Sequence, residues 1–388
     1  MRNILILLLV IAVSGCGWIR HPFGGGAPVE PPAKLTDIRP TLRIQPLWST
    51  RVGSGFGKRY VRVSPGVSDG RVYAADGKGR VAALDAGNGK TIWETDADVP
   101  LSAGVGVGDG LVLVGSSNGE VVALDVDDGA IRWRVRLSSE VLSAPQASGG
   151  VVVARAVDGR LFGLDASNGA RLWVYQGSVP VLTLRGTSTP ALVRGAVISG
   201  FDSGKVAELG LTDGRVLWEQ TVAVPHGRSE LDRMVDVDAD PRVYAGVVYV
   251  VAFQGRIAAL DVDSGNMLWT RDISSYAGIG VGSGAVYVSD AHSDVWALDR
   301  STGTSIWKQD ALHNRQVTAP GVLDESVVVG DFEGYLHWLA RDDGQILARY
   351  RADSAGILAA PVVTDNTVYV LGKGGHLTAL RVSPLAAP

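Results

Sequence analysis

A repeated pattern, Gly-x-Val-x-Ala-Leu-Asp-x-x-x-Gly-x-x-x-Trp, limits what this chain can fold into more than any other feature. Copies of it, some strong and some weak, end at Trp93, Trp133, Trp173, Trp218, Trp269 and Trp307, and a further copy has Ala348 in place of tryptophan. Apolar segments of strand length alternate with turn-forming residues, and no helical periodicity is present. A period near 40 to 45 residues with about four strands per unit is typical of a β-propeller.

The two ends of the chain complete one another. An eighth copy begins at Val368, continues through Ala379-Leu380, and ends before any tryptophan. The missing outer strand is present near the N-terminus, where Trp48 precedes Trp93 by 45 residues. The sequence therefore predicts an all-β, eight-bladed propeller of four-stranded antiparallel blades over residues 46–381, closed by the N-terminal strand and followed by a tail, 382–388.

The residues of the repeat have structural tasks that need no ligand. Its glycines suit tight turns, where positive φ is often required. Its tryptophans can bury 150–250 Å² each against a neighbouring blade. Ligand contact is the alternative for these indoles, but packing is the simpler interpretation.

The N-terminus indicates a lipid-anchored protein. The apolar run Ile4 to Val13 is shorter than the roughly 20 residues of a membrane-spanning helix and reads as a signal peptide, 1–15. Val13-Ser14-Gly15-Cys16 resembles the lipobox of bacterial lipoproteins, and Cys16 is the sole cysteine. Residues 16–45 are rich in glycine and proline and predict a flexible tether. Gly17 in place of aspartate implies the outer membrane of a Gram-negative host. A secretory signal with a chance cysteine is the alternative.

The repeat resembles that of the pyrroloquinoline quinone (PQQ) dehydrogenases and of propellers that kept the blade without the cofactor. Those enzymes hold the quinone under a disulfide between adjacent cysteines, which a single cysteine cannot form. Asp236-Val237-Asp238-Ala239-Asp240 resembles the start of a calcium loop, but Pro241 and Val247 occupy the positions that need glycine and glutamate. We therefore predict no cofactor, no metal and no catalytic residue.

Charge disfavours nucleic acid as a partner. Lysine and arginine number 36 against 40 aspartates and glutamates, for a net charge of −4, and no basic run stands out. A protein partner is the better prediction.

Two insertions interrupt the repeat in the same half of the predicted ring. They lie between Trp173 and Trp218 and between Trp218 and Trp269, where the spacing grows to 45 and then 51 residues. The first contains 179–186, which is apolar with one arginine, and the second contains the acidic run 229–238. Neighbouring loops of this kind predict a partner-binding patch. In the alternative interpretation, the leucines belong to a strand core and the aspartates only solvate a loop.

These segments also resemble the BamB family of outer-membrane protein assembly lipoproteins. The resemblance lies in Leu182-Thr183-Leu184-Arg185-Gly186 and in Glu230-Leu231-Asp232-Arg233 followed by Asp236-Val237-Asp238. It implies a non-catalytic scaffold of the β-barrel assembly machinery (the BAM complex) that docks on the periplasmic POTRA domains of BamA. The contact set carried over by the resemblance is Leu182, Leu184, Arg185, Asp236 and Asp238.

Two hypotheses stay open beside this docking role. In the first, nascent outer-membrane β-barrel proteins add strands to exposed blade edges of the scaffold. In the second, the chain is a periplasmic PQQ-type quinoprotein or a small-ligand-binding propeller.

Overall fold

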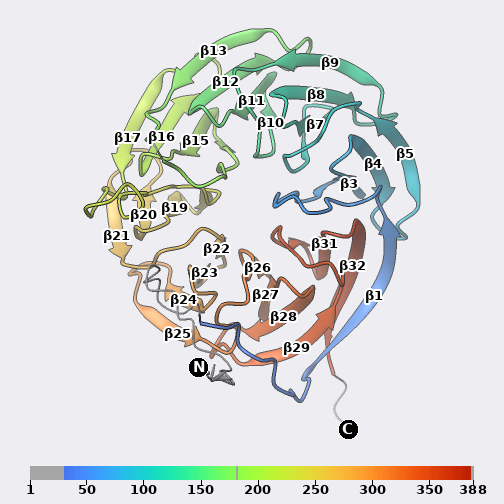
Figure 1. The fold of residues 1–388 in the computed structure, drawn as a ribbon, viewed down its shortest axis with the longest axis vertical. Helices are drawn as coiled ribbons and strands as arrows, with labels where there is room; N and C mark the ends of the chain where they lie inside the picture. The colour runs from blue at the N-terminus through green and yellow to red at the C-terminus, as the bar shows by residue number, and fades with distance from the viewer. Residues whose placement is uncertain (1–29, 181, 386–388) are drawn as a thin grey trace, which may run out of the picture. The chain divides into compact units, whose positions relative to one another are not determined.

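Eight four-stranded antiparallel sheets form a ring around a central axis (Figure 1). The computed structural model describes residues 30–180 and 182–385, and the ring belongs to the compact unit that begins at Pro32. This arrangement confirms the predicted eight-bladed propeller. The signal peptide and Cys16 lie outside the described residues. Within the described part, no helix is long and apolar enough to cross a membrane.

The blades are numbered in chain order, and each runs from an inner strand to an outer one. Blade 1 contains β2 (Gly66–Ser68), β3 (Arg71–Ala75), β4 (Arg80–Asp85) and β5 (Thr91–Asp96). Blade 2 contains β6 (Gly106–Gly108), β7 (Leu111–Gly115), β8 (Glu120–Asp125) and β9 (Ile131–Arg136). Blade 3 contains β10 (Gln146–Ser148), β11 (Val151–Arg155), β12 (Arg160–Asp165) and β13 (Arg171–Gln176). Blade 4 contains β14 (Ala191–Val193), β15 (Ala196–Gly200), β16 (Lys205–Gly210) and β17 (Val216–Thr221).

The second half of the ring repeats this order. Blade 5 contains β18 (Arg242–Tyr244), β19 (Val247–Val251), β20 (Ile257–Asp261) and β21 (Met267–Arg271). Blade 6 contains β22 (Gly278–Val281), β23 (Ala285–Ser289), β24 (Val295–Asp299) and β25 (Ser305–Gln309). Blade 7 contains β26 (Gly321–Val322), β27 (Ser326–Gly330), β28 (Tyr335–Ala340) and β29 (Ile346–Arg351). Blade 8 contains β30 (Val362–Thr364), β31 (Thr367–Leu371), β32 (His376–Pro384) and β1 (Leu42–Arg51).

The two middle strands of each blade form the core. Every residue of β7 is buried, whereas the outer strand β9 buries only Trp133 completely. Middle strands are covered on both faces by neighbouring blades, so they carry continuous runs of valine, leucine and alanine instead of an alternating pattern.

Tryptophan joins each blade to the next. The indole N–H donates to a backbone carbonyl of the following blade at 2.8–3.1 Å in seven of the eight blades. The indole ring of the tryptophan also packs on the glycine of the next Asp-x-x-x-Gly turn. Trp93, for example, packs on Gly129, which has φ of 73°. Packing is therefore the role of these tryptophans, as the sequence suggested.

Blade 7 has no tryptophan on its outer strand, and other side chains fill the space that this indole occupies elsewhere. Its outer strand has Ala348 at the tryptophan position, and Trp338 stands opposite on the third strand, fully buried. Leu42 and Ile44 of β1 pack against this cluster. The N-terminal strand thus closes blade 8 by pairing with β32 and also fills the junction with blade 7.

The described structure differs from the predicted boundaries at both ends. β1 begins at Leu42, inside the segment predicted as a tether, and β32 extends into the predicted tail as far as Pro384. Upstream of β1, Arg315 and Arg349 donate hydrogen bonds to the carbonyls of Ala33 (2.9 Å) and Thr36 (3.1 Å). Residues 33–41 are therefore fastened to blades 6 and 7, because their backbone meets arginines that the sequence pattern did not connect with them.

The tryptophan–glycine contact gives a first prediction. Gly129→Ala places a methyl group 2.5 Å from the Trp93 ring, whereas Gly110→Ala, at the nearly identical φ of 74°, meets nothing within 4 Å. Both variants carry the backbone strain of left-handed geometry, about 1–2 kcal/mol. Only Gly129→Ala adds overpacking of about 1–3 kcal/mol. Urea unfolding should show the larger loss of stability for Gly129→Ala; equal losses would contradict the contact's role.

Candidate partner-binding loops and central cavity

The two insertions form neighbouring loops on one face of the ring. Residues 177–190 connect β13 to β14, and residues 222–241 connect β17 to β18. Each runs from the outer strand of one blade to the inner strand of the next. The backbone N–H of Leu184 donates to the Asp236 carboxylate, and that of Thr189 donates to Asp240 Oδ1 at 2.7 Å. The structure therefore brings together the two segments that the sequence singled out.

The five predicted contact residues divide into an exposed group and a buried group. Leu182 is 38% exposed, and Arg185 lies at the surface, where its Nη2 forms an ion pair with Glu140 Oε2 at 2.9 Å. Leu184 is half-buried. Asp236 and Asp238 are buried; the Asp236 carboxylate accepts the Leu184 N–H, and Asp238 lies in the wall of a central cavity. The burial of both aspartates was not predicted from the sequence.

Further apolar side chains are exposed on the same two loops. Val179 belongs to the first loop, and Val224 and Leu231 belong to the second; Leu231 is 64% exposed. With Leu182 they provide apolar surface on the two loops, the first of which also carries Arg185. Exposed apolar groups next to an arginine are a common composition of protein-binding patches. We call the set Val179, Leu182, Arg185, Val224 and Leu231 the insertion patch.

A buried arginine lies behind the loops. Arg155, the last residue of β11, is fully buried; its guanidinium donates to Asp202, to the Gly200 carbonyl and, at 3.1 Å, to Ser188 Oγ. Sequence reasoning missed this residue. A charged residue at the end of the apolar run Val151-Val152-Val153-Ala154 was the signal that could have found it, because a buried arginine requires partners.

Burial changes the ionisation of the two aspartates. It raises the pKa of Asp238 to about 7, and the negative charge of Asp202 adds to this while Arg155 opposes it. Burial also raises the pKa of Asp236 to about 6, against the effect of the Leu184 backbone N–H. A carboxylic acid that is neutral in the fold avoids much of the cost of burying a charge.

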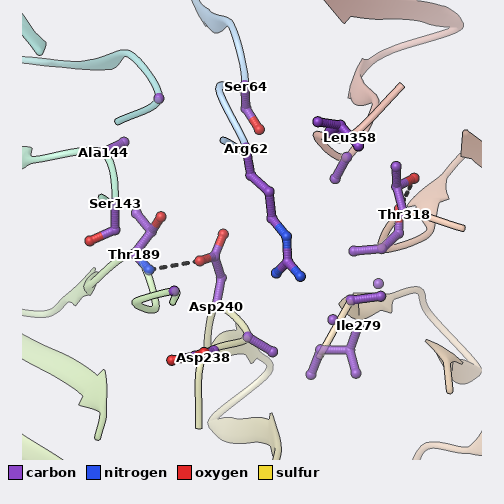
Figure 2. Close-up of a pocket in the computed structure, with 18 of the residues that line it drawn as sticks. Arg62, Ser64, Ser143, Ala144, Thr189, Asp238, Asp240, Ile279, Thr318 and Leu358 are labelled. Carbon is purple, nitrogen blue, oxygen red and sulfur yellow. Dashed lines mark hydrogen bonds between the residues drawn. The ribbon is translucent and has the colours of Figure 1, made fainter. Parts of the chain in front are cut away.

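The insertion loops also line a central cavity of about 510 Å³ (Figure 2). Arg62 reaches into it between Asp240 and Ile279 and donates to the Tyr276 carbonyl at 2.7 Å. Arg185 and Asp238 belong to its wall. Within the described residues, no group of three or more His, Cys, Asp and Glu side chains is placed to hold a metal ion.

The fold and the repeat define a class of protein, a propeller of PQQ-like blades. The family described as "Outer membrane protein assembly factor BamB" matches residues 45–97 and 77–309. Relatives of that name from Pseudomonas aeruginosa and Alkalilimnicola ehrlichii are 47% and 48% identical, covering 98% of this chain and 99% and 97% of theirs. The chain belongs to the BamB family.

Solved structures agree with this assignment. The crystal structure of BamB from Moraxella catarrhalis superposes with a TM-score of 0.81 at 27% identity, over 87% of this chain and all of that one. A quinohemoprotein alcohol dehydrogenase from Comamonas testosteroni has a TM-score of 0.69 at 15% identity, over 89% of this chain and 77% of that one. This second likeness is one of fold alone.

The buried aspartates give a second prediction, on pH. Asp238 has a pKa of about 7 in the fold, against about 3.9 in an unfolded chain. Below about pH 4 Asp238 is neutral in both states, and its burial then does not lower the free energy of unfolding. As pH rises from about 4 to about 7, the unfolded chain releases this proton while the folded protein keeps it, so the free energy of unfolding falls. Asp238→Asn should remove this loss and be more stable than wild type at pH 7.5, by on the order of 2–4 kcal/mol.

Urea unfolding at several pH values between 4 and 8 measures this effect. Asp263→Asn, which removes a carboxylate that is 81% exposed, is the control and should keep the wild-type pH dependence. A wild-type slope in Asp238→Asn would contradict the assignment.

Proposed function

We propose that this protein is a non-catalytic scaffold of the outer-membrane β-barrel assembly machinery, docking on the periplasmic POTRA domains of a BamA protein. Family membership supports the assembly role, because the relatives are named outer membrane protein assembly factors. The observation that carries the docking site is the insertion patch. It is exposed, and its loops are held together by backbone N–H groups that donate to the carboxylates of Asp236, which is buried, and Asp240, which is partly buried.

Within this proposal the two groups of residues have different tasks. Leu182, Leu184 and Arg185 meet the partner, and the insertion patch extends this contact through Leu231. Asp236 accepts the Leu184 N–H, and Asp240 accepts the Thr189 N–H, so the first loop is fixed before the partner arrives. Loops that are ordered in the free protein lose less conformational entropy on binding.

We also propose that acylated Cys16 anchors the protein to the outer membrane at its periplasmic face. Several acyl chains on one residue give much firmer binding than a single chain. Residues 16–32 separate Cys16 from the segment 33–41 that is fastened to blades 6 and 7, and a chain of that length spans on the order of 55 Å when fully extended.

The exposed arginine of the insertion patch gives a third prediction. Arg185→Ala should weaken binding to the purified periplasmic domains of the host's BamA at least about tenfold, because truncating an interface arginine commonly costs 2 kcal/mol or more. Its stability should change by less than about 1 kcal/mol, since the ion pair with Glu140 is exposed. Biolayer interferometry measures the first effect, and urea unfolding the second.

Arg80→Ala is the matched control. Arg80 also forms an exposed ion pair, with Glu94, but on blade 1. Its removal should leave BamA binding unchanged. If both variants bound equally well, the insertion patch would not be the docking site; if wild type did not bind at all, the docking role would be wrong.

A further inference from the structure

A cleft opens at the outer rim between blades 2 and 3, and none of its lining residues belongs to the insertion patch. Its volume is about 620 Å³, within the usual range for ligand sites. The apolar part of its wall is formed by Val135 and Leu137 beyond Trp133 and by Phe162, Leu164 and Val174 of blade 3. The polar part of the wall contains Ser138 and the three arginines Arg136, Arg160 and Arg171, and no carboxylate belongs to it. We call this site the rim cleft.

The rim cleft exists because blade 3 departs from the repeat at one position. The residue directly after the outer-strand tryptophan, or after Ala348 in blade 7, is polar or charged in the other seven blades: Ser49, Glu94, Arg134, Glu219, Thr270, Lys308 and Arg349. In blade 3 it is Val174, and this valine is 47% exposed. An apolar side chain thus faces solvent where every other blade has a polar one.

In other blades this position forms an ion pair across the sheet. Glu94 pairs with Arg80 in blade 1, Glu219 with Lys205 in blade 4, and Lys308 with Asp294 in blade 6. Blade 3 keeps the cation, Arg160, but Val174 cannot pair with it. Arg160 instead reaches Gln176 Oε1 at 2.7 Å and Asp158 Oδ2 at 3.2 Å.

The other two arginines of the rim cleft have no carboxylate partner among the described residues. Arg136 donates only to the Asn118 carbonyl, at 3.2 and 3.3 Å, and no ion pair of Arg171 occurs there. The cleft therefore joins apolar surface with uncompensated positive charge. A ligand that matches both must carry an anionic group next to an apolar one.

The free edge of β13 runs beside the cleft. The order of the sheet is β10-β11-β12-β13, so the outer edge of β13 pairs with no strand in the described part of the chain. Its sequence, Arg171-Leu172-Trp173-Val174-Tyr175-Gln176, has no proline and a single charge, so few of the features that block strand pairing are present. An extended peptide can hydrogen-bond to such an edge while its side chains enter the adjacent cleft.

We propose that the rim cleft binds an extended peptide segment that carries both acidic and apolar side chains on one face, at every second residue. The peptide adds to the free edge of β13, its apolar side chains contact Val174 and Phe162, and its carboxylates meet Arg136 and Arg171. A lipid surface is the less favoured partner. A lipid headgroup offers no strand backbone to the free edge of β13, and residues 33–41, which lead to the proposed anchor, join the ring at blades 6 and 7, four blades away from the cleft (Figure 1).

Val174→Glu tests the proposal. Glutamate at this position restores the pairing with Arg160 that blades 1 and 4 have, so the variant should fold with unchanged or higher melting temperature. The probe is a fluorescein-labelled peptide with threonine at every second residue and with phenylalanine and glutamate taking turns at the positions between, so that both lie on one face of the strand. The variant should bind this peptide at least tenfold more weakly than wild type. Fluorescence anisotropy on the full chain in detergent micelles measures this binding, and circular dichroism measures the melting temperature.

Thr270→Glu is the matched control, because it adds the same charge at the same position of blade 5, near Arg256. Thr270→Glu should bind the peptide with an affinity within twofold of that of wild type. A second peptide, with glutamine in place of glutamate, should bind wild-type protein at least fivefold more weakly than the acidic peptide does. Arg171→Gln, which changes an exposed side chain, should also weaken peptide binding. This variant tests the proposal if Val174→Glu does not fold.

Three results would overturn the proposal. The first is unchanged peptide binding by both Val174→Glu and Arg171→Gln. The second is an equal loss in Thr270→Glu, which would indicate an effect of net charge alone. The third is binding to phosphatidylglycerol vesicles that Val174→Glu abolishes while peptide binding persists, which would make the rim cleft a lipid site.

Discussion

The contact between each tryptophan and the next blade is the interaction on which the ring depends. The indole N–H satisfies a carbonyl of the neighbouring turn, and the ring packs against a glycine with no side chain to displace it. Each contact joins blades that are neighbours in sequence, so the ring grows blade by blade. Closure of the ring joins distant parts of the chain, because β1 pairs with β32.

Regularity of this kind makes the exceptions informative. Blade 7 lacks the outer tryptophan, yet Trp338 across the strand and Leu42 from the N-terminus fill the same space. That exception is explained by packing alone. Val174 in blade 3 has no such compensation, since it leaves Arg160 without its usual partner and exposes apolar surface. A departure that packing does not explain is the better candidate for function.

Carboxylates of the second insertion loop accept hydrogen bonds that hold the first loop in place. Buried carboxylates are costly, and the raised pKa values of Asp236 and Asp238 express that cost. In return, backbone N–H groups of one loop find acceptors on the other, and Leu182 and Arg185 are carried on an ordered segment. The residues that a partner would touch and the carboxylates that hold their loop are thus different, and they lie about 50 residues apart in sequence.

The sequence by itself determined the fold, the number of blades and the closure by Trp48, because each of these follows from a local pattern of turns, apolar runs and tryptophans repeated along the chain. It also located the two insertions. Only the tertiary structure decided that Asp236 and Asp238 are buried, that Arg155 lies behind them, and that residues 33–41 are fastened to blades 6 and 7. The rim cleft likewise needed the structure, because its arginines come from two blades. The physical reason is that burial, pKa and charge compensation depend on which distant segments become neighbours, and a one-dimensional repeat does not contain that information.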